Sequence, residues 1–88
     1  MKAESNEFDP EERELRDGIQ EELKQTLLAL KRSMKERDYD QAVLLCLSAS
    51  RYLRELDEHG LATDADRSLL YAMRSNVHEI FRIQNRYH

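Results

Sequence analysis

Four side chains in this 88-residue sequence belong to the types that most often bind metals or act as nucleophiles: three histidines and one cysteine. A helical metal site uses a pair of histidines four residues apart or a Glu-x-x-His spacing, and neither pattern surrounds His59, His78 or His88. Cys46 lies inside the apolar run 42–47, where apolar neighbours raise the pKa of a thiol. We therefore interpret the histidines as exposed structural residues and the cysteine as a small buried hydrophobe, and we expect no metal site.

Glycine-rich loops are also missing from the sequence. Gly18 and Gly60 are isolated from one another, so no loop is present in which successive backbone N–H groups could approach a phosphate. Without a nucleophile and base, a metal cluster or a phosphate-binding loop, the sequence predicts a protein that is not an enzyme and that uses no cofactor.

Composition limits the setting in which the protein works. A single cysteine forms no disulfide within the chain, which fits a reducing compartment. The first dozen residues are acidic and lack the apolar stretch of a signal peptide. The longest apolar run is the six-residue stretch 42–47, well short of the roughly 20 residues that span a bilayer. We expect a cytoplasmic protein without membrane insertion.

Length and charge limit its size and partners. Chains of about 100–150 residues usually form one domain, so 88 residues predict one small domain. The net charge of −4 argues against nucleic acid as a partner, because affinity for phosphate comes from excess positive charge. We expect a flexible acidic tail over residues 1–8 and one domain over residues 9–88.

Start and stop signals divide that domain into three helices. Asp9, Pro10 and Glu12 predict a helix start with a capping box, and the first helix extends to about residue 37. Asp38 with Gln41 three residues later predicts the second start, after a connection of only one or two residues. The second helix is expected to end at residue 59, before Gly60, and the third to be capped by Thr63 or Asp64.

Each predicted helix carries one apolar face, which indicates an all-α, up-down-up antiparallel three-helix bundle. The expected core positions of the first helix are Leu15, Ile19, Leu23, Leu27, Leu30 and Met34. Those of the second are Ala42, Val43, Cys46, Ala49, Ser50, Leu53 and Leu56. Those of the third are Leu69, Leu70, Met73, Val77, Ile80, Phe81 and Gln84, with Ile83 and Tyr87 at the edge.

A few residues do not fit these faces and are our candidates for partner binding. Leu28, Leu44, Leu47 and Tyr71 point well away from the predicted core, and Arg51 shares the outer side of the second helix. We expect Leu28, Leu44 and Leu47 to form a groove for an amphipathic helix of a partner protein or for a second copy of the chain. The alternative is that they are ordinary isolated apolar residues on a surface.

Charge is unevenly distributed along the chain. Residues 1–22 hold nine acids and three bases, whereas residues 67–88 hold four arginines and one glutamate. Acids near a helix start and bases near a helix end complement the helix dipole, which explains much of this pattern. The same asymmetry makes head-to-tail contact between two molecules conceivable.

Three stretches, residues 37–43, 53–56 and 69–76, resemble small flagellar export chaperones of the FliT type in length, hairpin layout and leucine spacing. That resemblance implies a small acidic cytosolic chaperone that holds an unassembled export substrate on apolar helical surface. The stretch 39–42 also resembles tetratricopeptide hairpins and three-helix microtubule-interacting-and-transport modules, which bind partner helices too.

These observations predict a non-enzymatic protein-binding module, a chaperone or adaptor that holds a helical segment of another protein. Two alternatives stay open at this point. One is a structural protein that associates with itself, as a homodimer or a larger helical bundle. The other is a small regulator that sequesters an enzyme or a transcription factor.

Overall fold

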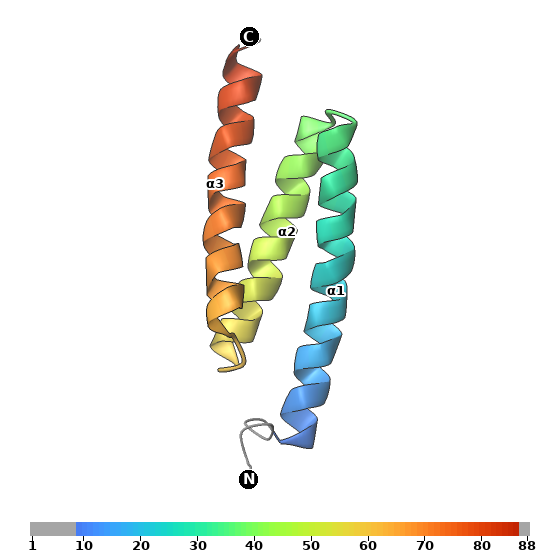
Figure 1. Cartoon of the computed structure of the whole chain (residues 1–88), viewed down its shortest axis with the longest axis vertical. Coiled ribbons are helices and arrows are strands. Elements are labelled where there is room, and N and C mark those ends of the chain that lie inside the picture. Colours follow the sequence, from blue (N-terminus) through green and yellow to red (C-terminus); the bar gives the residue numbers. More distant parts are fainter. Residues whose placement is uncertain (1–8, 87–88) are drawn as a thin grey trace.

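The computed structural model describes residues 9–86, and these form three helices (Figure 1). They are α1 (Pro10–Lys35), α2 (Tyr39–Glu58) and α3 (Asp64–Arg86). They run up, down and up, so the all-α three-helix architecture predicted from the sequence is confirmed. The predicted tail over residues 1–8 and the edge position Tyr87 lie outside the described residues.

The predicted cap of α1 is present as a reciprocal pair of hydrogen bonds. The Glu12 backbone N–H donates to Oδ1 of Asp9 over 2.8 Å, and the Asp9 backbone N–H donates to Oε1 of Glu12 over 3.1 Å. Pro10 occupies the first turn, where its missing N–H costs no helical hydrogen bond. The residue types at this helix end therefore determine where α1 begins.

The connection between α1 and α2 contains a feature that the sequence did not indicate. Arg37 has a φ of 61°, a left-handed conformation that residues other than glycine seldom adopt. It allows the Asp38 backbone N–H to donate to the Ser33 carbonyl over 2.9 Å, which closes the end of α1. Asp38 also caps α2, since its Oδ1 accepts a hydrogen bond from the Gln41 backbone N–H.

The connection between α2 and α3 follows the predicted stop signal. Gly60 has a φ of 72°, and the Leu61 backbone N–H donates to the Leu56 carbonyl over 2.8 Å. Leu56 and Leu61 are buried together with Ile19, so the end of α2 is joined to α1 by an apolar contact. α2 ends at Glu58, one residue before the predicted end, and His59 is its cap.

α2 is the helix on which the other two pack. Both α1 and α3 approach it closely along their lengths, whereas no Cα of α1 lies within 8 Å of a Cα of α3. The face of α2 between them carries small side chains, and Ala42, Cys46 and Ala49 are completely buried. Small residues at these positions let both neighbouring helices come close to the α2 backbone.

Three residues that we expected in the core are exposed: Leu15 at 40%, Met34 at 39% and Phe81 at 49%. Leu15 lies in the second turn of α1 and Met34 in its last turn, so both are close to the ends of the helix, and α1 extends below the end of α2 (Figure 1). Phe81 follows the buried Ile80 and is therefore turned about 100° away from it around α3. The prediction that these three residues are buried was wrong.

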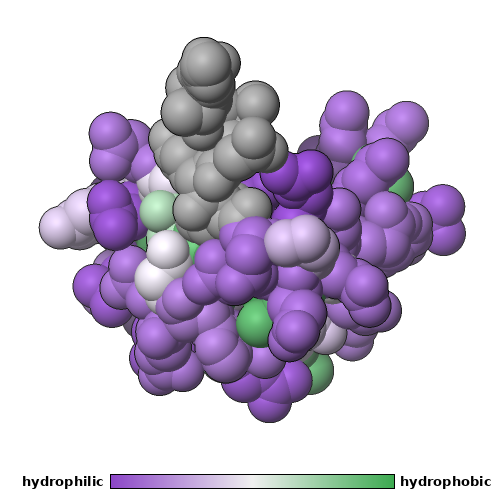
Figure 2. All heavy atoms as spheres, turned by 90° about the horizontal axis from the view of Figure 1, so that it is seen from below, coloured by the Kyte–Doolittle hydropathy of each residue, from purple (hydrophilic) through white to green (hydrophobic). Residues whose placement is uncertain are grey.

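The lower end of the bundle is mainly hydrophilic. Figure 2 views the molecule from below and shows a largely hydrophilic surface with a few separate hydrophobic areas. This agrees with a core that lies along α2 rather than at the end of the bundle.

One buried acid joins the starts of α1 and α3. Asp66, 8% exposed, accepts a hydrogen bond of 2.9 Å from the Thr63 backbone N–H and one of 3.3 Å from the Gln20 side chain. Arg16 Nη2 lies 3.6 Å from Asp66 Oδ2, and Arg16 Nε also donates to the Leu61 carbonyl. Asp66 therefore connects the cap of α3 to α1.

Replacing Asp66 tests the importance of this contact. We expect Asp66→Ala to lower the free energy of unfolding by about 2 kcal/mol, because it leaves part-buried donors on Gln20 and Arg16 without an acceptor. Urea denaturation followed by circular dichroism measures the change. Asp64→Ala is the matched control, since this exposed carboxylate of the same helical turn contributes only a surface ion pair to Arg67. A loss as small as that of the control would contradict a structural role for Asp66.

Replacing Arg37 tests the conformation of the α1–α2 connection. We expect Arg37→Gly to raise the free energy of unfolding by about 1 kcal/mol, because glycine adopts a positive φ without steric cost. Arg32→Gly is the control within the last turn of α1, where glycine should instead lower stability by about 1 kcal/mol. Equal destabilisation by both changes would show that residue 37 is not left-handed in solution.

Candidate protein interface

The outer side of α2 carries apolar residues that the bundle does not cover. Leu44 is 58% exposed and Leu47 is 51% exposed, and both line a shallow hollow with Ser48, Arg51 and Arg54. The opposite side of the same helix is its fully buried small-residue face. Three of the predicted partner-binding residues, Leu44, Leu47 and Arg51, therefore lie together.

Two polar contacts show how α2 and α3 are aligned. Near the start of α2, the Gln84 side chain donates a hydrogen bond of 2.8 Å to Oδ1 of Asp40. Near the end of α2, Arg67 Nη2 lies 3.5 Å from Oδ1 of Asp57. Because the two helices are antiparallel, each step forward along α2 from Asp40 corresponds to an equal step back along α3 from Gln84.

This alignment places residues on the outer side of α2 at the same level as residues on one side of α3. Steps of three and four residues stay on one side of a helix, so Leu47 comes level with Val77, and Val43 with Phe81. Val43 and Val77 are half-buried and pack against the core, while Phe81 is half exposed. We call this surface the α2–α3 seam. It consists of Val43, Leu44, Leu47, Arg51 and Arg54 of α2 and Leu70, Tyr71, Arg74, Val77 and Phe81 of α3.

The seam is apolar in one half and carries three arginines in the other, with Glu55 and Glu58 beside Arg51 and Arg54, and Asp57 beside Arg74. Arg51, Arg54 and Arg74 are exposed, and none of them forms an ion pair with another residue in the range 9–86. Tyr71, 72% exposed, lines a hollow beside Arg74 and Leu70. The predicted candidate Tyr71 therefore belongs to the same surface as the candidates on α2.

Leu28 is not part of this surface, which corrects the predicted groove. It is 56% exposed, but it lines a separate hollow with Lys31, Arg32, Lys35 and Glu36, all in the last turns of α1 or directly after them. The residues that line this hollow come from α1 and the residue directly after it, and none comes from α2 or α3. Leu28 is thus separated from the hollow that contains Leu44 and Leu47.

Six of the ten seam residues were not among our candidates. The expected core included Val43, Leu70, Val77 and Phe81, and Arg54 and Arg74 were not predicted to bind a partner. These residues can be identified only from the two helices together. Counting forward from Asp40 and back from Gln84 gives the residues of α2 and α3 that lie at the same level, once the alignment of the helices is known. The periodicity of one helix does not contain that alignment.

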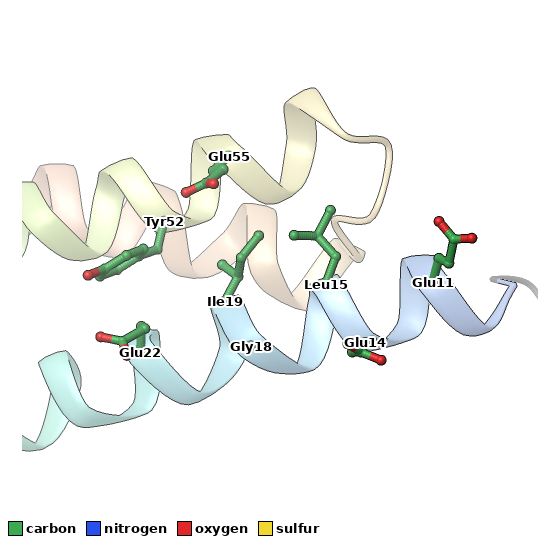
Figure 3. A pocket seen from close by; sticks show the side chains of 8 residues that line it. All are labelled: Glu11, Glu14, Leu15, Gly18, Ile19, Glu22, Tyr52 and Glu55. Carbon is green, nitrogen blue, oxygen red and sulfur yellow. The ribbon is translucent and has the colours of Figure 1, made fainter.

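A further hollow lies between the start of α1 and the end of α2 (Figure 3). It is open and encloses about 570 Å³. Leu15 and Ile19 point from α1 towards α2, and Tyr52 reaches from α2 towards α1 (Figure 3). Its charged lining is entirely acidic and consists of Glu11, Glu14, Glu22 and Glu55. We call it the acidic hollow.

The histidines and the cysteine that the structure describes lie apart from one another. Cys46 is fully buried, and burial raises the pKa of its thiol, as predicted. His59 caps the end of α2 and His78 is exposed on α3, while His88 lies outside the described residues. Within residues 9–86, no group of three or more histidine, cysteine, aspartate or glutamate side chains is arranged to hold a metal ion.

Comparisons with known proteins add no assignment. No family model matches this chain, and neither do curated proteins or solved structures. Among the described helices, none is both long and apolar enough to cross a membrane. The physical properties of the surfaces described above are therefore the basis for a functional proposal.

Cys46 offers a test of how tightly α1 and α3 pack on α2. Because the thiol is buried and its pKa is raised, we expect alkylation by iodoacetamide at pH 8 to be at least about a hundredfold slower than in the denatured chain. Mass spectrometry over time measures the reaction. As a control, the double variant Cys46→Ala, Ala29→Cys carries an exposed thiol on α1 and should react at nearly the denatured rate. Rapid alkylation of the native chain would show that this core opens readily.

Proposed function

We propose that this protein is a binding module that holds an amphipathic helix of a partner protein on the α2–α3 seam. The observation that carries the proposal is the half-exposed state of Leu44, Leu47 and Phe81 on one side of a bundle. An 88-residue chain needs its large apolar residues for its own core, so three that are half exposed on a single seam are costly unless a partner covers them.

The shape of the seam suits a helical partner. Two packed helices leave a shallow groove between them, and a third helix fits such a groove with residues spaced at three and four. Full burial of a large apolar side chain contributes about 1.5–3 kcal/mol. Covering the exposed parts of Leu44, Leu47 and Phe81 would thus provide a useful share of the binding free energy.

The seam also favours one charge on its partner. Arg51, Arg54 and Arg74 border the apolar residues and form no ion pair within residues 9–86. An amphipathic helix with acidic residues along its flanks would pair with them, whereas a basic helix would be repelled. We therefore propose an acidic amphipathic helix as the ligand.

Within this function, a chaperone or adaptor role is the leading proposal. A seam that covers one helix of an unassembled protein would keep its apolar face from aggregating, as the resemblance to FliT-type export chaperones implies. A regulator that sequesters an enzyme or a transcription factor would use the same surface. Both are proposals about the same seam and differ in the identity of the partner.

Substitutions at two equally exposed leucines test the proposed function. We expect Leu47→Asp to abolish retention of helical partner proteins when the chain is used as bait in a native lysate, because it places a charge in the apolar half of the seam. Leu28→Asp is the matched control, since Leu28 is as exposed but lies outside the seam. Quantitative mass spectrometry compares the retained proteins, and circular dichroism confirms equal helix content. If both variants retain the same proteins as the native bait, the seam is not the binding surface.

A further inference from the structure

The acidic hollow has an apolar floor that the bundle leaves open. Leu15 is 40% exposed there, although it points from α1 towards α2 (Figure 3). Ile19 continues the floor on α1, and the half-buried Tyr52 closes it from α2. The hollow encloses about 570 Å³ and is open to solvent, which suits side chains of a protein partner better than a small molecule that must be buried on most sides.

A glycine lines this hollow without a structural reason within the chain. Gly18 is in the interior of α1, where glycine destabilises a helix relative to alanine. A Cβ at this position would meet no neighbouring atom of the described chain within 4 Å, so packing within the bundle does not require glycine. The missing side chain allows a partner to approach the α1 backbone closely.

The charged residues of α1 around the floor are all acidic. Glu11, Glu14 and Glu22 lie on the side of α1 that carries Gly18, since steps of three and four residues stay on one side of a helix. None of the three glutamates forms an ion pair within residues 9–86. The first base on this side of α1 is Arg32, about 15 Å further along the axis than Glu22. The bases of α1 that are nearer in sequence lie about 120° or more around the helix from Gly18, and they are Arg13, Arg16 and Lys24.

The first two of these glutamates also lie away from the bases of α2. Arg16 Nε donates to the Leu61 carbonyl over 3.3 Å, which places this part of α1 level with the connection after α2. Glu11 and Glu14 precede Arg16 and lie where α1 extends below α2 (Figure 1). Glu55 differs from them, because it also shares a hollow with two arginines of the seam. The negative charge of the acidic hollow therefore comes mainly from α1.

We propose that the acidic hollow is a second docking surface, which binds a basic amphipathic helix of another protein. Apolar side chains of that helix cover Leu15 and Tyr52, and its lysines or arginines pair with Glu11, Glu14 and Glu22. Charge complementarity selects this occupant, because the same glutamates would repel an acidic segment. The inference goes beyond the proposed function, since this surface lies between α1 and α2 and not on the α2–α3 seam.

A synthetic helical peptide is the probe for this surface. It has about 16 residues, with leucines at steps of three and four, lysines on both flanks of the leucines, alanine elsewhere and a fluorescein label. A matched peptide carries glutamate in place of every lysine. In fluorescence anisotropy at about 50 mM salt, we expect the full chain to bind the lysine peptide with a dissociation constant below about 50 µM, and the glutamate peptide at least about tenfold more weakly. No binding of the lysine peptide, or equal affinity for both peptides, would overturn the proposal.

Removing two carboxylates locates the binding site. We expect Glu11→Gln with Glu22→Gln to raise the dissociation constant of the lysine peptide by about tenfold or more. Glu36→Gln with Glu79→Gln is the control, since it changes the net charge equally at exposed positions outside the acidic hollow. The control should keep the native affinity within about twofold. Equal losses in the two double variants would show that the overall charge attracts the peptide, and would overturn the site.

Gly18→Gln separates binding from folding. We expect the Tm to rise by about 3 °C, because glutamine favours a helix more than glycine does and the space around this position is open. The dissociation constant of the lysine peptide should rise by about tenfold, since the new side chain occupies part of the hollow. A more stable variant with native affinity would contradict close packing of the partner at Gly18.

A seam variant distinguishes this inference from the proposed function. Leu47→Asp should leave the affinity for the lysine peptide unchanged, because Leu47 lines a different hollow. Loss of binding in this variant would place the peptide on the seam and overturn the inferred site. Failure of the seam itself would instead appear as unchanged capture of lysate proteins by Leu47→Asp, which leaves the peptide assay unaffected.

Sedimentation equilibrium tests a second copy of the chain as the occupant. We expect the native chain to show the 10.5 kDa of one copy at the concentrations of the peptide assay. A native dimer that Glu11→Gln with Glu22→Gln converts to a monomer, together with no binding of the lysine peptide, would overturn a basic helix of another protein as the occupant.

Discussion

The close packing of two helices on one small-residue face is the constraint on which this structure depends. Ala42, Cys46 and Ala49 are completely buried, and α1 and α3 meet this face from two sides without approaching one another closely along the backbone. A larger side chain at any of these positions would push a neighbouring helix outward, because cores have few voids to absorb added volume. α2 thus determines the position of both other helices, although it is the shortest of the three.

Because one face of α2 packs against α1 and α3, the opposite face is left at the surface of the bundle. A helix has about 3.6 residues per turn, so a buried stripe through Cys46 leaves Leu44, Leu47 and Arg51 on the outer side. These residues cannot join the core by a small rotation, because rotating α2 would expose the alanines and force the outer side chains into the narrow space between α1 and α3. The exposure of Leu44 and Leu47 is a consequence of the packing and not of a loosely formed bundle.

The sequence predicted most of the fold because its signals are local. The capping box at Asp9, the glycine at position 60 and the buried face of α2 each depend on residues within a few turns. The features that it did not predict depend on distant partners. Phe81 is exposed because of how α3 is aligned with α2, and Asp66 is buried because Arg16 and Gln20 approach it from α1. The candidate residues of α2 lie together, whereas Leu28 lies in a separate hollow. The periodicity of a helix shows on which side a residue lies, but not which neighbouring helix that side faces.

The distribution of charge separates the polar groups that stabilise the monomer from those left for a partner. Asp66, in the first turn of α3, has its partners within the chain. Arg16 forms an ion pair with it, and the Gln20 side chain and the Thr63 backbone N–H donate hydrogen bonds to it. The arginines of the seam form no ion pair in the described chain, but acids of the same helix lie beside them, since Glu55 and Glu58 share a hollow with Arg51 and Arg54. Residues four apart on a helix are neighbours, so part of this positive charge is compensated within α2. The exposed leucines of the seam have no comparable compensation, and burial of their apolar surface is therefore the main contribution that a partner would make to binding.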